Sequence, residues 1–350
     1  MAKITFIFTH RDGRGSQYYA RGNRLVKQHI EKAVIDAGLE PVFLDHTEYC
    51  PYDPSPEELD RMYKYGNKGL FEFYKIVERE AANSIALVAW DRHPLHPEFL
   101  WHLKCKKVMF AMESPEGVYR LIVPFAHCFD MIFYNNPFYS PGVRMEEMLR
   151  RWGCKSCHNF HYGVKEVRYN AEDEEQVFSL KRDIDLVFVG QLYNKCDRIM
   201  KIKKHFGERM KICGNWSYKS MLAVSWRHKI PLWVRPVDDL NSLYARAKIG
   251  INFHITYGIG NARLFEVPAN GAMLLSDGVG YGLEEIFRLG DEALGFNDVD
   301  EAIDKIEYYL SHDDERIKIA RKGFQRVIDN YLMPTTLKYA IHAILEETKK

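Results

Sequence analysis

Residues 249–287, which read IGINFHITYGIGNARLFEVPANGAMLLSDGVGYGLEEIF, decide the fold of the second half of this chain. Two short apolar runs, Ile249–His254 and Ala272–Ser276, have the length and composition of buried strands. Each run is followed by a glycine-containing loop and then by a helical pattern. This order is typical of a parallel sheet in which helix N-termini face the carboxyl ends of the strands. Because such an edge binds anions, the stretch predicts a site for a phosphate-bearing ligand.

The loop and helix after the first run contain the residues that we expect to bind this ligand. The loop carries Gly258 and Gly260, and Asn261 is expected to cap the helix with its side chain. Arg263 and Glu266 are three positions apart, so both project from one face of the helix. An arginine fork suits phosphate oxygens, and a carboxylate accepts hydrogen bonds from ribose hydroxyls. The alternative is a surface ion pair that contributes little.

These residues also carry a family resemblance. RLFEVPANGAMLLSD at 263–277, followed by GLEEIF at 282–287, resembles the C-terminal domain of CgeB-like glycosyltransferases, within the retaining, sucrose-synthase-like GT-B group. The likeness runs with gaps from Asp185 to Tyr331. It implies an α/β fold of GT-B type, with two Rossmann-like domains facing across a cleft and a C-terminal helix that crosses back to the first domain.

The resemblance also implies a donor site with one departure from the family pattern. In the wider group, two glutamates eight positions apart flank the donor loop. Glu266 matches the second glutamate, which binds the donor ribose in the family. Gly258 stands where the first glutamate would fall, and this leaves the sugar contact open.

Further donor-binding candidates come from other turns of the chain. They are Gly13, Arg14, Gly15, Gly190, Arg198, Asn215, Arg235 and His254. The first three lie in the turn HRDGRGS at 10–16, which in GT-B enzymes borders the donor phosphates; an ordinary strand–helix turn is the alternative. In the CgeB-like pattern an arginine follows a glycine at a similar distance to that between Gly190 and Arg198. His254 ends a predicted strand and fits a core histidine as well as a ligand contact.

Polar residues followed by proline close three predicted strands of the first half. Ligand groups often lie at such carboxyl ends, although simple strand termination explains them too. If the transfer inverts the sugar, a base in the first domain must take the acceptor proton, and the candidates are Asp91, His93 and Glu113. If it retains the configuration, as the resemblance implies, His93 is expected to contact the sugar.

The chain of 350 residues is long enough for two domains. We expect an acceptor domain at 1–168, an acidic linker at 169–182, a donor domain at 183–331 and a C-terminal helix at 332–350 that packs back on the first domain. Within these domains, Glu57–Ala82 is predicted to be one long helix and Leu232–Arg235 a strand.

Composition limits the function classes. The net charge of +1 offers no bulk attraction for nucleic acid. No apolar run approaches the roughly 20 residues of a membrane span. The N-terminus, MAKITFIFTH, is too short in its apolar part for a signal peptide. Seven cysteines without an export signal indicate a reduced, cytoplasmic protein.

Two motifs have the letters of metal or haem sites. Cys154, Cys157 and His158 form a C-x-x-C-H pattern, and His161 adds a possible fourth ligand. Haem attachment requires export, and zinc requires a second ligand pair on a compact knuckle, so we expect no metal here. Asp298–Asp300 reads Asp-Val-Asp but opens a predicted helix, where Asp298 is better explained as a cap.

We therefore expect a hexosyl- or pentosyltransferase that uses a UDP-linked donor, acts with retention and needs no metal or other cofactor. Two alternatives stay open: a GT-B sugar-nucleotide epimerase, and a non-catalytic module that binds a nucleotide or sugar. Gly258 in place of a glutamate favours the module. The acceptor could be a glycan, a protein, a small molecule or a modified nucleic-acid base, and the sequence does not indicate the oligomeric state.

Overall fold

The computed structural model divides into two compact units, and it describes residues 1–8, 17–51, 54–112, 115–166, 168–191, 196–254 and 259–349. The first unit comprises Met1–Lys165 and Met333–Lys350, and the second comprises Glu166–Leu332. Some predicted site residues lie outside the described ranges, namely Gly13, Arg14, Gly15, Glu113 and Gly258.

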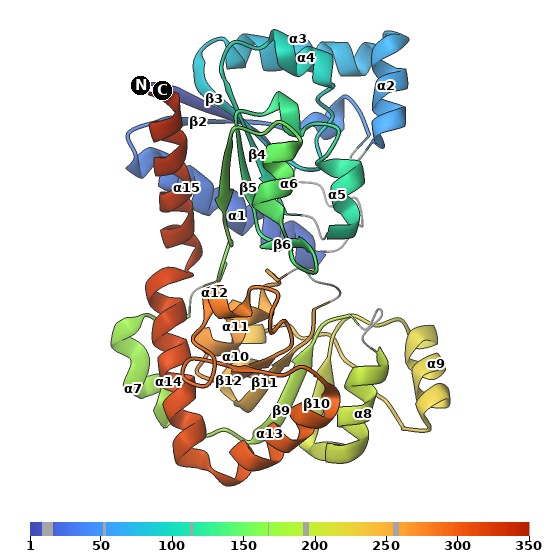
Figure 1. Cartoon of the computed structure of the whole chain (residues 1–350), viewed down its shortest axis with the longest axis vertical. Coiled ribbons are helices and arrows are strands. Elements are labelled where there is room, and N and C mark those ends of the chain that lie inside the picture. The colour runs from blue at the N-terminus through green and yellow to red at the C-terminus, as the bar shows by residue number, and fades with distance from the viewer. Residues whose placement is uncertain are drawn as a thin grey trace. The chain divides into compact units, whose positions relative to one another are not determined.

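Six parallel strands form the sheet of the first unit, in the order β2-β1-β3-β4-β5-β8 (Figure 1). They are β1 (Lys3–Ile7), β2 (Glu40–Leu44), β3 (Ser84–Trp90), β4 (Lys106–Ala111), β5 (Met131–Tyr134) and β8 (Ser156–Asn159). A separate antiparallel pair consists of β6 (Phe138–Ser140) and β7 (Val143–Arg144). The central strands β3, β4 and β5 are mostly apolar on both sides, as expected for a parallel sheet covered by helices on both faces.

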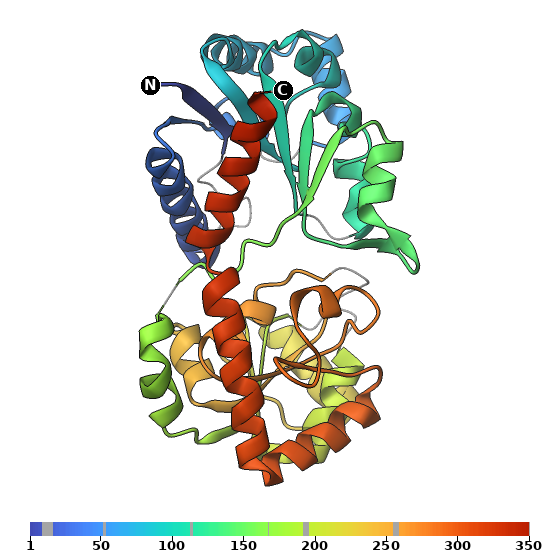
Figure 2. The ribbon, with the colours of Figure 1, turned by 60° about the vertical axis from the view of Figure 1, so that its left-hand side comes forward.

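Two helices cover one face of this sheet, and they come from opposite ends of the chain (Figure 2). They are α1 (Gln17–Asp36) and α15 (Met333–Thr348). The Met333 N–H donates to the carbonyl of Val164, and the Thr336 hydroxyl donates to the carbonyl of Tyr162. The opposite face packs against α2 (Pro56–Lys64), α3 (Lys68–Ala81), α4 (Pro97–His102), α5 (Pro115–Leu121) and α6 (Met145–Arg151).

The helix predicted over Glu57–Ala82 is wrong in one respect, because it is two helices. Gly66 adopts a φ of +68°, a left-handed conformation that ends α2. The Asn67 side chain then accepts the Leu70 N–H at 3.0 Å and begins α3. The chain therefore turns between α2 and α3.

The second unit has its own parallel sheet, in the order β10-β9-β11-β12-β13. Its strands are β9 (Ile184–Val189), β10 (Met210–Cys213), β11 (Ala247–Asn252), β12 (Met273–Ser276) and β13 (Leu294–Gly295). The predicted strand Leu232–Arg235 is wrong, since only Arg235 pairs with Cys213, in an isolated bridge. The α/β class with two parallel sheets is confirmed.

Helices cover both faces of the second sheet (Figure 1). They are α8 (Cys196–Phe206), α9 (Tyr218–His228), α10 (Leu240–Ala245), α11 (Arg263–Ala269), α12 (Leu283–Ile286), α13 (Val299–Ser311) and α14 (Asp313–Asn330). Short 3₁₀ helices occur at His46–Glu48, Ala126–Cys128, Ala171–Asp173 and Gly207–Arg209. No helix in the described ranges is long and apolar enough to cross a membrane.

The stretch expected as a linker, 169–182, has structure of its own. It contains α7 (Glu174–Ser179), and Val177 of this helix is fully buried. Phe178 packs edge-on against Phe324 of α14, at a ring distance of 6.0 Å. These residues therefore belong to the second unit. Helix α7 is short, with Val177 as its one buried residue, so the sequence shows no periodic apolar pattern there.

The close packing of α11 on β11 can be tested at Gly250, in the middle of the strand. A β carbon at Gly250 would lie 2.5 Å from one methyl group of Val267 and 2.7 Å from the other. We expect Gly250→Ala to lower the free energy of unfolding by about 1–3 kcal/mol through overpacking. Val267→Ala removes both methyl groups. The double variant should therefore lose less unfolding free energy than the sum of the two single variants, by about 0.5 kcal/mol or more. Urea titrations of the full chain measure all four proteins, and additive costs would contradict this packing.

Candidate functional site

The order of the second sheet reverses between β9 and β11, so their carboxyl ends form a topological switch point. In open α/β sheets, ligands bind outside this point. β9 ends at Val189 and is followed by Gly190, while β11 ends at Asn252. The predicted ligand stretch, 249–287, therefore includes one side of the switch point.

Arg263, in the first turn of α11, connects the two sides of the switch point. Its Nε donates to Asn252 Oδ1 at 2.9 Å, and its two terminal nitrogens donate to the carbonyls of Val189 and Phe253. The guanidinium lies over the ring of Phe188, 5.0 Å from the centroid. Arg263 thus positions the ends of β9 and β11, a role that neither the phosphate prediction nor the surface-pair alternative had included.

Asn252 is fully buried beside Arg263 and extends the network to β12. Its amide group donates to Ser276 Oγ at 2.9 Å and lies 3.2 Å from His254 Nε2. The other ring nitrogen of His254, Nδ1, lies 2.7 Å from Asp277 Oδ1. These partners assign the ring proton to Nδ1, with Nε2 as an acceptor. Because both nitrogens are engaged inside the unit, the structure favours the core interpretation of His254.

Arg198 completes the network from α8. One of its terminal nitrogens donates to Asp277 Oδ2 at 3.0 Å, and the other donates to the carbonyl of His254 at 3.2 Å. The guanidinium also lies 4.9 Å from the ring centroid of Phe253. The Arg198 side chain is nevertheless 39% exposed, compared with 13% for Asp277. Arg198 is therefore anchored at the switch point and still open to a ligand. Asp277 closes the stretch that carries the family resemblance but was not predicted as a site residue, although it follows a strand end in the same way as Asp91.

The predicted cap at Asn261 is wrong. Ala262 is the N-cap of α11, and Asn261 contributes only its backbone carbonyl, which accepts the Leu264 N–H at 3.2 Å. The Asn261 Oδ1 atom is buried and has no hydrogen-bond partner within the described ranges. A buried oxygen without a donor costs about 1–3 kcal/mol, so a donor group on a ligand would satisfy it. Gly260 precedes Asn261. Glu266, which lies three residues after Arg263 in α11, is half-buried.

The remaining donor candidates lie near the carboxyl ends of β9 and β10. The Gly190 N–H donates to the carbonyl of Cys213, and the Gly190 carbonyl accepts from the indole of Trp216 at 2.7 Å. Asn215 and Arg235 are exposed at the same edge of the sheet. Their side chains are thus accessible, but the structure gives them no contact with the Arg198 network among the described residues.

The first unit holds Asp91 and His93 in its interior. Asp91 Oδ2 accepts the Met112 N–H at 2.8 Å, which connects the ends of β3 and β4. His93 Nδ1 accepts the Leu95 N–H at 3.1 Å.

The ring of His93 packs against Phe125 and Phe129, at centroid distances of 4.8 and 5.5 Å. Burial lowers the pKa of His93 to about 3, with a smaller effect from His46. The structure therefore places the ring of His93, which was predicted as a base or sugar contact, in the core of the first unit.

Cys154 and His158 of the C-x-x-C-H motif form hydrogen bonds with nearby protein groups. The Cys154 thiol donates to the carbonyl of Ser156 at 3.2 Å, and His158 lies on the edge strand β8 with Nδ1 3.2 Å from the hydroxyl of Tyr339. Among the described residues, three potential metal ligands lie close together only at Cys196, Asp197 and His228. In the Asp-Val-Asp motif at Asp298–Asp300, Asp298 Oδ1 accepts the Glu301 N–H at 2.9 Å, which confirms Asp298 as the N-cap of α13.

The buried His93 predicts a pH-dependent stability. The unfolded chain protonates this histidine near pH 6.5, whereas the folded protein does so near pH 3. Because the unfolded state binds more protons between these values, stability falls as the pH decreases through this window. Between pH 7 and pH 5, this histidine should lower the free energy of unfolding by about 2 kcal/mol.

His93→Asn keeps an acceptor for the Leu95 N–H but does not titrate. Over the same pH range, the free energy of unfolding of the variant should therefore fall by about 2 kcal/mol less than that of the natural chain. Urea unfolding at pH 7 and pH 5 measures both. Equal losses would show that the ring reaches solvent.

Comparisons with known proteins agree with this architecture. Residues 196–341 match the family model described as glycosyl transferase-like. No curated protein sequence matches the chain. Sucrose-phosphate synthase from Thermosynechococcus elongatus is similar in structure, with 13% identity, a TM-score of 0.66 and 99% of each chain covered.

Two other solved structures are similar to the same extent. A glycosyltransferase from Rickettsia africae ESF-5 has 12% identity and a TM-score of 0.67, with 100% of this chain and 99% of that chain covered. Anabaena HepE in complex with UDP and glucose has 11% identity and a TM-score of 0.62, with 99% and 100% covered. The chain therefore has the α/β fold of the GT-B glycosyltransferases, built from two Rossmann-like domains with parallel sheets.

Proposed function

We propose that this protein is a glycosyltransferase with a UDP-linked sugar donor, whose diphosphate binds at the carboxyl ends of β9 and β11. One observation carries the proposal: Arg198 is anchored to Asp277 at this switch point and its side chain remains 39% exposed. An arginine fork suits phosphate oxygens. The match of residues 196–341 to a glycosyl transferase-like family and the shared fold with a UDP-bound protein, HepE, support it.

In this proposal the site residues have separate roles. Arg198 stabilises the negative charge of the leaving diphosphate. Asp277 holds Arg198 in position, and His254 in turn fixes Asp277. The buried Asn261 oxygen accepts a hydrogen bond from the nucleotide or sugar, and Glu266 accepts from the ribose hydroxyls.

We further propose that transfer proceeds with retention and without a metal on the diphosphate, as in the CgeB-like enzymes. Inversion requires a base near the acceptor. Two of the three base candidates, Asp91 and His93, are buried, and Asp91 also accepts a backbone N–H, which favours retention. The seven cysteines are free thiols, as expected for a reducing compartment such as the cytoplasm.

Arg198 provides the first test. We expect the full chain to bind UDP in calorimetry and Arg198→Ala to weaken binding by about 1.5–3 kcal/mol, the contribution of a charged hydrogen bond. Arg209→Ala is the matched control, because Arg209 is an exposed arginine of the same unit that pairs with Asp185. Its UDP affinity should equal that of the natural chain. If the intact protein binds no common nucleoside diphosphate, the proposed function is wrong.

Glu266 provides a second test, which isolates the ribose contact. The natural chain should bind UDP more tightly than 2′-deoxy-UDP, because the ligand loses a hydroxyl that donates to the carboxylate. Glu266→Gln keeps the size of the side chain but removes its charge, so the discrimination should shrink by about 1 kcal/mol or more. Undiminished discrimination in Glu266→Gln would place the ribose elsewhere.

Turnover separates the proposed transferase from the alternatives. A transferase hydrolyses UDP-sugar slowly without an acceptor and rapidly transfers the sugar when one is added. An epimerase converts the donor with no acceptor, and a binding module leaves it unchanged. Product analysis of a UDP-sugar panel, with and without acceptor mixtures, distinguishes these outcomes.

A further inference from the structure

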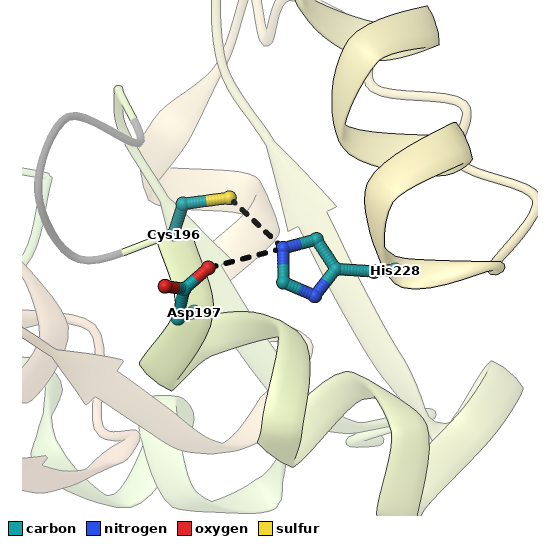
Figure 3. A group of neighbouring side chains, drawn as sticks. All are labelled: Cys196, Asp197 and His228. Carbon is teal, nitrogen blue, oxygen red and sulfur yellow. Dashed lines mark hydrogen bonds and ion pairs between the residues drawn. The ribbon is translucent and has the colours of Figure 1, made fainter.

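A second polar cluster lies between α8 and α9 (Figure 3). Cys196 and Asp197 are the first two residues of α8, and His228 is the last residue of α9. The His228 Nε2 atom lies 3.8 Å from Cys196 Sγ and 3.2 Å from Asp197 Oδ1. All three ligand atoms lie within 4.8 Å of one another. A thiol, a carboxylate and an imidazole thus point at one small volume.

We propose that the cluster of Cys196, Asp197 and His228 binds a zinc ion or a chemically similar divalent transition metal. Zinc bonds of about 2.3 Å to sulfur and about 2.0–2.2 Å to nitrogen and oxygen place tetrahedral ligands roughly 3.5 Å (S to N) and roughly 3.3 Å (N to O) apart. The observed distances from His228 Nε2, 3.8 Å to Cys196 Sγ and 3.2 Å to Asp197 Oδ1, lie within a few tenths of an ångström of these tetrahedral ligand–ligand distances. The third edge, from Sγ to a carboxylate oxygen, is not longer than 4.8 Å, and the Asp197 side chain is 62% exposed and therefore able to turn toward the sulfur.

The chemistry of the donor set selects the class of metal. Thiolate and imidazole ligands suit zinc and cobalt, whereas magnesium and calcium prefer sites made of oxygen atoms alone. Three protein ligands leave the fourth tetrahedral position for water. The site is therefore specific for a transition metal.

Arg227 supports this geometry from outside the cluster. Its Nη2 donates to Asp197 Oδ2 at 3.0 Å, so that Oδ1 is the oxygen directed at His228. Carboxylates that bind metals are commonly held by such an outer hydrogen bond. The Arg227 side chain is 67% exposed, and solvent screens its repulsion of a cation.

The cluster lies at the ends of two helices, so an ion bound there would link α8 to α9. None of the residues of α9, Tyr218–His228, is buried, so few apolar contacts hold this helix to the unit. A metal bound by both helices would fix the C-terminal end of α9 to the first turn of α8. This role is separate from the proposed transfer reaction, which uses no metal on the diphosphate.

Cobalt provides a spectroscopic test that does not depend on activity. The full chain is freed of metal with a chelator and titrated with Co²⁺. We expect stoichiometric binding, with a thiolate-to-cobalt charge-transfer band in the near ultraviolet and the intense visible bands of tetrahedral Co²⁺. Zinc should displace the cobalt, abolish the bands and raise the melting temperature.

Variants locate the site. Cys196→Ser should abolish the charge-transfer band, and His228→Gln should weaken zinc binding at least about tenfold in competition with a coloured chelator. Cys213→Ser and the double variant Cys154→Ser/Cys157→Ser are controls and should keep the band and the affinity. The melting temperature of each metal-free variant checks folding, and the near-isosteric Cys196→Ser keeps the test valid if His228→Gln is unstable.

Three results would overturn the proposal. The first is no stoichiometric cobalt binding by the natural chain. The second is cobalt binding without a thiolate band. The third is a band that survives in Cys196→Ser or disappears in the Cys154/Cys157 variant.

Discussion

The buried hydrogen bonds around Asn252 hold the carboxyl edge of the second sheet together. Carbonyls at strand ends have no partner within the sheet ladder, and buried backbone groups need one. Arg263 supplies donors to the carbonyls of Val189 and Phe253, while Asn252 connects β11 to Ser276 at the end of β12. Each member of this network bonds to another member, which makes the edge rigid and gives α8 a fixed anchoring point at Asp277.

The two arginines of this network, Arg263 and Arg198, have different environments. Arg263 meets three acceptors in different directions, which requires the planar fork of a guanidinium and excludes lysine. Gly190 is a consequence of this arrangement, because a β carbon there would lie 2.3 Å from Arg263 Nη1. The glycine after β9 is therefore required by a protein side chain, with no need to invoke a phosphate. Arg198 is paired with Asp277 but remains partly exposed, so of these two arginines it is the one that can contact a charged ligand.

The sequence predicts the parallel sheets and the strand–loop–helix order of 249–287 because apolar runs and glycines report directly on local structure. It also indicates Arg198, but only through a family resemblance. Burial of His93 was not predictable, since its surroundings come from Phe125 and Phe129 more than thirty positions away. Cys196 and His228 are also distant in sequence and meet only after α8 and α9 have packed.

Helix α8 links the two polar clusters of the second unit. Consecutive residues on an α-helix project about 100° apart, so Arg198 can reach Asp277 at the sheet edge while Cys196 and Asp197 face His228 on α9. A rigid helix passes a small rotation of its first turn to every side chain on that turn. The first turn of α8 therefore joins the Cys196–Asp197–His228 cluster to the Arg198–Asp277 pair at the sheet edge, so a change in one contact reaches the other through the helix backbone.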